Sequence, residues 1–234
     1  MRVLFPRGGP ALDAVLINTS GGVTGGDCIS VTAQVGQGSA LTLTTQTAER
    51  AYRAQPTETG RVTTDISVAN DGSLKWLPQE MILFNGCNLD RRLNVELAQS
   101  ATALLVETIV FGRAAMGEKL DDIRFKDRIS VCRNGSPLYL DGISMGGDVS
   151  AQLTRAAVAQ GSGAMTSVVY VAPDAEALLN PIRAILPPFS GASLLAKDVL
   201  VIRLVAQDSF VLRQGLIPLL ERLSNGPLPK TWRL

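Results

Sequence analysis

Apolar and polar residues alternate with a period of two through most of the first 145 residues of this chain. Side chains at alternate positions of a β-strand point to opposite faces, so each alternating run predicts a strand with one buried face. The pattern is clearest at residues 29–35, 62–68, 89–97 and 123–131. Residues 42–52, with their hydroxyl-bearing side chains, predict a further strand. The N-terminal part of the chain is therefore expected to be rich in β-structure.

Turn-forming residues separate these predicted strands. Ala69-Asn70-Asp71-Gly72 and Cys132-Arg133-Asn134-Gly135-Ser136 have the composition of tight β-hairpin turns. We therefore expect successive strands to pair antiparallel.

The pattern changes after Gly147. Residues 165–172 and 199–205 predict two more strands, and the second run is apolar enough to be buried on both faces. A helix is expected to open at Asp174, as its N-cap, and to be kinked or split by Pro181. A second helix is expected at 208–223, interrupted by Gly215 and Pro218. The fold class expected from these patterns is mainly β, with antiparallel sheets and about two α-helices in the C-terminal third, forming one domain over residues 1–234.

Composition narrows the possible chemistry. The chain has no histidine, so it cannot by itself assemble a Ser-His-Asp or Cys-His catalytic system or a His-ligated zinc site. Its three cysteines are far apart and predict reduced thiols, not a disulfide framework. A net charge of +1 gives no general attraction to nucleic acid or to a membrane surface. With no apolar run long enough for a signal peptide or a membrane span, we expect a cytoplasmic protein.

A glycine-rich loop is the most distinctive local feature of the sequence. Two glycine pairs, Gly21-Gly22 and Gly25-Gly26, lie between two predicted strands and are followed by Asp27. Glycine adopts positive φ without steric penalty and allows close approach of other atoms, so the loop is expected to be tightly bent or closely packed. Asp27 is expected to cap this loop. A phosphate-binding loop is an alternative, although no Lys-Ser/Thr pair or clear helix follows it.

Carboxylates also occur inside apolar segments. Glu80 follows Gln79 between two apolar stretches, and Glu107 has apolar neighbours on both sides. A buried carboxylate must be paired, hydrogen-bonded or bound to a metal, because an isolated buried charge costs several kcal/mol. The nearest partner in sequence for Glu107 is Arg113, and an ion pair that pins a turn is the simplest explanation.

Together these segments resemble the UreD (UreH) family of urease accessory proteins. The resemblance rests on an ordered set of short motifs between about residues 10 and 130 and on Leu228-Pro229-Lys230-Thr231-Trp232 near the end. The motif residues are Gly21, Gly22, Gly25, Gly26 and Asp27, then Thr45 and Gln46, then Pro78 and Gln79 before Glu80, and finally Gly112, Arg113 and Gly117 after Glu107.

The resemblance implies a non-enzymatic maturation factor with no tightly bound cofactor. It implies binding to the urease apoprotein, to a helical accessory protein (UreF-type) and to a GTPase (UreG-type), and delivery of nickel as transient cargo, through an internal tunnel. It also implies a β-rich fold of stacked or coiled sheets with two helices. Family members carry additional N-terminal strands and a histidine before the glycine loop; this sequence matches neither feature.

The resemblance directs attention to three carboxylates as lining for a nickel path: Glu80, Glu107 and Glu118. Oxygen ligands suit a divalent cation that must be released again. A structural β-sandwich interaction protein without a metal role is the alternative from a different class, and a phosphate- or nucleotide-binding enzyme is a further one.

Overall fold

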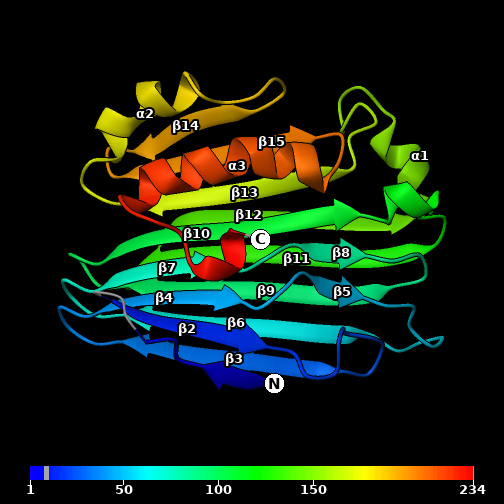
Figure 1. The fold of residues 1–234 in the computed structure, drawn as a ribbon, viewed down its shortest axis with the longest axis horizontal. Helices are drawn as coiled ribbons and strands as arrows, with labels where there is room; N and C mark the ends of the chain where they lie inside the picture. Colours follow the sequence, from blue (N-terminus) through cyan, green and yellow to red (C-terminus); the bar gives the residue numbers. More distant parts are fainter. Residues whose placement is uncertain (8–10, 234) are drawn as a thin grey trace.

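The chain winds back and forth between two β-sheets that enclose a common core (Figure 1). The computed structural model describes residues 1–7 and 11–233. Sheet A contains β1 (Arg2–Leu4), β2 (Leu12–Ile17), β4 (Ala40–Thr45), β5 (Glu49–Ala51), β7 (Ser73–Leu77), β8 (Met81–Leu83), β10 (Thr102–Phe111), β13 (Ala164–Val171), β14 (Gly191–Ala196) and β15 (Val199–Ala206). Sheet B contains β3 (Cys28–Val35), β6 (Gly60–Val68), β9 (Asn88–Leu97), β11 (Ile123–Arg133) and β12 (Ser136–Gly147).

The central strands of both sheets pair in parallel, because the chain returns to the same sheet only after crossing to the other. In sheet A, Leu12 aligns with Leu41, which aligns with Leu74, and Leu74 aligns with Ala103 of β10. Sheet B repeats this arrangement through β3, β6, β9 and β11. The expected antiparallel pairing is therefore wrong for these strands. It holds for β1 with β2, β11 with β12, and β10 with β13 to β15.

The two predicted hairpin turns have different outcomes. The turn at 134–135 joins β11 and β12 as an antiparallel hairpin, which confirms that prediction. The turn at 69–72 instead links β6 in sheet B to β7 in sheet A. Its backbone still closes tightly, since the Gly72 N–H donates to the Ala69 carbonyl at 3.0 Å. The local turn chemistry was therefore correct, but the turn is an arch between sheets and not a hairpin.

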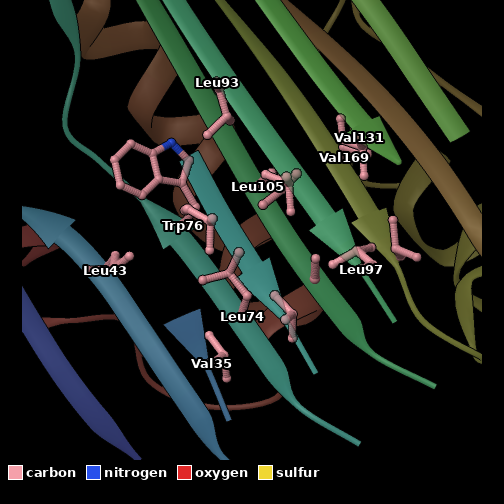
Figure 2. Close-up of a cluster of buried hydrophobic side chains, with 14 of the residues drawn as sticks. Val35, Leu43, Leu74, Trp76, Leu93, Leu97, Leu105, Val131 and Val169 are labelled. Carbon is pink, nitrogen blue, oxygen red and sulfur yellow. The ribbon is translucent and has the colours of Figure 1, made fainter. Parts of the chain in front are cut away.

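Apolar side chains from both sheets meet in the space between them (Figure 2). Leu43, Leu74 and Leu105 come from sheet A, and Leu93 and Val131 face them from sheet B. Burial of a leucine side chain of this kind contributes roughly 1.5–3 kcal/mol. The two sheets are thus held together along their length by ordinary hydrophobic packing, and any charge placed among these residues must be paired.

We call the parallel strands of the two sheets, from β2 to β11, the parallel coil. In the described chain, three α-helices follow it: α1 (Val149–Leu153), α2 (Ala175–Arg183) and α3 (Ser209–Ser224). Helix α3 lies across the outer face of sheet A, over β13 and β15 (Figure 1). Its leucines and Trp232, in the short 3₁₀ turn Lys230–Trp232, are buried in a second core on that face. The leucines of α3 are therefore core residues.

The helix predictions require three local corrections. Helix α3 is continuous through Gly215 and Pro218, because its leucine-rich face is anchored on sheet A. Helix α2 likewise continues past Pro181 to Arg183. Asp174 occupies the N-cap position of α2, but its side chain accepts a hydrogen bond from Tyr170 and does not cap the helix.

The predicted class, a mainly β protein with stacked, coiled sheets and helices near its C-terminus, is confirmed. The expected single strand over 42–52 is in fact two strands, β4 and β5, separated at residues 46–48. Within the described part of the chain, no helix is long and apolar enough to cross a membrane.

Candidate functional site

Glu107 lies between the two sheets, where it joins a buried cluster of charged side chains. It is 5% exposed and belongs to β10 in sheet A. Its Oε1 accepts a hydrogen bond from Trp76 Nε1 at 2.8 Å, and its Oε2 lies 2.5 Å from Arg91 Nη1. The expected pairing of Glu107 with Arg113 is wrong, because the partner, Arg91, comes from β9 in the opposite sheet.

Arg91 connects Glu107 to a second buried carboxylate. Its Nε and Nη2 donate to the two carboxylate oxygens of Asp127 at 2.9 and 2.7 Å. Arg91 and Asp127 align on neighbouring parallel strands, in a row that continues through Val62 and Ile29. We call Arg91, Glu107 and Asp127 the buried triad. One cation faces two carboxylates in it, so the ionised triad carries one surplus negative charge.

The surplus charge affects the protonation of the triad. Burial raises the pKa of Glu107; Arg91 opposes this rise, and the nearby Asp127 adds to it. Burial alone would lower the pKa of Arg91, but the carboxylates of Asp127 and Glu107 outweigh that effect and raise it. Arg91 therefore stays charged, and burial favours the protonated form of Glu107.

A small cavity adjoins the triad. Its volume is about 70 Å³, and its lining includes Trp76, Arg91 and Glu107 together with Thr45 and Glu49. A second cavity of about 50 Å³ is also lined by Thr45 and Glu49 and extends to Gly21 in the glycine loop. The two cavities therefore adjoin, and together they lead from the triad toward the glycine loop.

Motif residues from three segments meet beside these cavities. The Gln79 backbone N–H donates to Thr45 Oγ1 at 2.9 Å, and Pro78 and Gln79 line the larger cavity. The Gln46 N–H donates to the Leu16 carbonyl at 3.0 Å, which ties the end of β4 to β2. Thr45, Gln46, Pro78 and Gln79 thus hold the edges of the cavity in place.

Glu80 is held in a separate cluster on the outer face of sheet A. It is 6% exposed, and its Oε1 accepts from Arg213 Nη1 of α3 at 2.8 Å. The same Nη1 donates to Gln79 Oε1 at 2.7 Å, and the Arg213 guanidinium lies over the Trp232 ring. Glu80 therefore connects the sheet to α3 and to the C-terminal turn.

Glu118 is partly buried and is paired with the exposed Arg113. Arg113 Nε donates to Glu118 Oε2 at 2.9 Å, and this bond holds the pKa of Glu118 below its usual range. Gly112 and Gly117 have φ of +78° and +65°, so they form the bends on either side of the 3₁₀ turn Ala114–Met116. The Arg113 guanidinium also stacks on the Phe84 ring, beside an open hollow of about 560 Å³.

The glycine loop is packed tightly against the chain's own side chains. A side chain at Gly22 would collide with the Tyr52 ring, and one at Gly25 would lie 2.7 Å from Glu58 Cβ. Asp27 Oδ2 accepts from the Thr24 N–H at 2.8 Å, so Asp27 does cap the loop. Gly21 and Gly26 have positive φ, at +78° and +84°. The carboxylate of Glu58 lies near Gly25 and Gly26, which makes the loop a poor cradle for phosphate.

The structure does not bring the three candidate carboxylates together. Glu80, Glu107 and Glu118 lie in three different places, and each is paired with an arginine. Among residues 1–7 and 11–233, no three cysteine, aspartate or glutamate side chains are grouped closely enough to hold a metal ion. The cysteines are free thiols, and burial raises the pKa of Cys87 to about 12, so Cys87 is protonated and a weak ligand.

Sequence reasoning missed the triad members Arg91 and Asp127. Both occupy inward positions of alternating strands, where every neighbour in the pattern is apolar. A charge at such a position is the signal that could have identified them. Arg213, the partner of Glu80, had no comparable signal, because it lies on a helix far along the chain.

Comparisons with known proteins agree with the motif pattern. A sequence model of the family described as UreD urease accessory protein matches residues 1–233. A protein of Ruegeria pomeroyi named urease accessory protein UreD is 51% identical over 234 residues, covering 100% of this chain and 91% of the relative. A protein of the same name from Roseobacter denitrificans is 46% identical over 234 residues, covering 100% of this chain and 86% of the relative.

Proposed function

Because the chain belongs to the UreD urease accessory protein family, we propose that it acts as a scaffold that binds apo-urease and helps to deliver nickel to it. Its role lies in urease maturation, and members of this family are accessory proteins without catalytic activity. The observation that carries the proposal is the family match along the whole chain, from residue 1 to residue 233.

The proposed partners are the urease apoprotein, a helical accessory protein of the UreF type and a GTPase of the UreG type. The parallel coil supports a scaffold role, since the two sheets and α3 offer several faces to partners. Neither a nucleic acid nor a membrane is needed for this role.

Nickel is proposed as transient cargo that passes through the space between the sheets. The cavities beside the triad support this, because Glu107, Thr45 and Glu49 offer oxygen atoms there. Both Glu107 oxygens already have partners in Trp76 and Arg91, so an arriving cation would have to compete with them. Such competition favours weak binding and release. Glu80 and Glu118 stay candidates for the same path at other points of the protein.

The test is co-expression of the chain with its urease subunits and accessory proteins. We expect copurification of a complex, and nickel-dependent urease activity that requires the chain. For the path, Glu107→Ala is compared with Ile109→Ala, which removes a buried side chain of the same strand and no carboxylate. Glu107→Ala should reduce activation more than its loss of folding stability explains.

Each outcome bears on a different part of the proposal. If wild-type chain forms no complex and supports no activity, the scaffold role is wrong. If the two variants lose activation in proportion to their stability, Glu107 has only a structural role, and the nickel path must be sought elsewhere. Activation that requires the chain but is equal without added nickel would contradict the delivery role alone.

A further inference from the structure

The outer face of sheet B carries a concentrated group of cations. Arg61 of β6, Arg92 of β9, and Lys126 and Arg128 of β11 are all exposed on this face; we call them the basic face. Strand register places them in two adjacent rows. One row runs Arg61, Asp90, Lys126, and the next runs Thr63, Arg92, Arg128. Neighbouring strands are about 4.8 Å apart, so these side chains form one continuous patch.

The charges of the basic face are not balanced within the sheet. Asp90 is the only carboxylate in the two rows, and it is bonded to Arg92. This bond, together with the nearby charges of Lys126 and Arg61, holds the pKa of Asp90 below its usual range. Arg92 and Arg128 align directly on paired strands, an arrangement that disfavours folding because like charges repel. Asp90 accounts for Arg92, but among the described residues no carboxylate pairs with Arg128.

A hollow makes these cations accessible. It has a volume of about 360 Å³, and its lining includes Arg92, Lys126 and Arg128 together with Asp90 and Asp127, which are already paired with Arg92 and Arg91. Gly142 of β12 aligns with Arg128, so no side chain from the neighbouring strand covers that guanidinium. A carboxylate entering the hollow could therefore contact several cations at once. Few other groups of the protein displace water from these cations.

We propose that the basic face is a docking surface for an acidic segment of a protein partner. The fit rests on charge complementarity: three carboxylates would neutralise the cations that Asp90 leaves unbalanced. The proposal goes beyond the scaffold function, because it names a surface and a partner chemistry and does not depend on which accessory protein supplies the segment.

A nucleic acid fits this face less well. The rows that continue the same face beyond Arg92 and Arg128 bring in Asp65 and then Glu96, so the positive patch ends there and a long phosphate backbone could not follow it. No aromatic side chain lies in the rows of the basic face, so no base could stack there. The patch is limited in extent, as expected for an acidic peptide or protein edge.

The test measures binding of a fluorescein-labelled oligoglutamate peptide to the full chain by fluorescence anisotropy at physiological salt. The variant combines Arg61→Gln, Lys126→Gln and Arg128→Gln. Its matched control combines Arg155→Gln, Lys197→Gln and Arg222→Gln, which remove the same charge from exposed positions elsewhere. We expect the basic-face variant to bind about tenfold more weakly, the combined size of three exposed ion pairs, and the control to bind like wild type.

Three results would overturn the proposal. Wild-type chain that does not bind the peptide has no such surface. Equal weakening in both variants would show a general effect of net charge. Tighter binding of a single-stranded oligonucleotide of equal charge, lost in the basic-face variant, would assign the surface to nucleic acid. Circular dichroism is used to check that each variant folds. If the triple variant does not fold, Lys126→Gln alone replaces it and is expected to weaken peptide binding about twofold.

Discussion

Strands β9 and β11 carry opposite arrangements of charge on their two faces. On the inner face, Arg91 aligns with Asp127 and the two side chains form a bidentate ion pair. One residue further along, on the outer face, Arg92 aligns with Arg128. The backbone register is the same, so the difference comes from solvent alone: a buried charge must be paired, whereas water screens exposed like charges. Inner charges are therefore constrained by folding, and outer ones are available for other roles.

The largest effect is expected from removing the central cation of the inner face. Arg91→Met keeps the apolar stem but leaves Glu107 and Asp127 buried without a positive charge. Because breaking a buried ion pair leaves uncompensated charge, the free energy of unfolding should fall by about 3–5 kcal/mol. Urea denaturation measures the change. Arg92→Met, one residue away on the outer face, is the control and should unfold close to wild type; similar losses in both would mean that the two faces do not differ as argued.

The second prediction concerns the pH dependence of stability, which should have opposite sign on the two faces. Glu107 has a raised pKa because it is buried, against an ordinary value of 4.5. Above pH 4.5 the folded state therefore binds more protons than the unfolded state, and the free energy of unfolding falls as pH rises. Glu107→Gln removes this effect. The variant should match wild type near pH 4 and become more stable toward neutrality, by at most about 1.4 kcal/mol per pH unit.

Asp90 on the outer face provides the opposite case. Its pKa is lowered, first by the hydrogen bond from Arg92, so its stabilising contribution is present above its ordinary value of 3.8 and is lost as pH falls. Asp90→Asn should therefore become less stable than wild type as pH rises, by a small, salt-sensitive amount. Urea unfolding from pH 4 to pH 8 compares both variants, and a common sign for the two slopes would refute the contrast.

The sequence predicted which faces of the strands are buried, but not which strands are neighbours. Alternation in residues 62–68 and 89–97 determines an inner and an outer face, and both strands formed as expected. The same alternation suits an antiparallel hairpin or a parallel coil, and the turn at Asn70-Asp71-Gly72 suits both. Only the crossing between sheets, which depends on contacts far apart in the chain, distinguishes them.

The candidate site could be predicted from the sequence to a similar extent. Apolar neighbours on both sides of Glu107 correctly predicted its burial and its need for a partner. The partner was chosen by proximity in sequence, and Arg113 lies beyond the bend at Gly112, which carries it to the surface. Arg91 is closer in space because it lies on β9 of the opposite sheet. A contact between two sheets has no local sequence signal, except that a charged residue occupies an inward position.

The smallest predicted change in unfolding free energy concerns the outer face. Its sign is opposite to the change expected for Arg91→Met. Arg128→Gln removes one member of the like-charged pair with Arg92, so the protein should gain about 0.3 kcal/mol of unfolding free energy at low salt. The gain should disappear at high salt, where exposed charges are screened. Arg124→Gln is the matched control, because Arg124 lies on the same face of β11 but aligns with Asn88 and not with a cation. A loss of stability in Arg128→Gln at every salt concentration would mean that Arg128 is held by partners inside the fold. Such a result would also remove the main reason to regard the outer cations as available for a partner. That reason is the repulsion between Arg92 and Arg128, which the fold itself does not require.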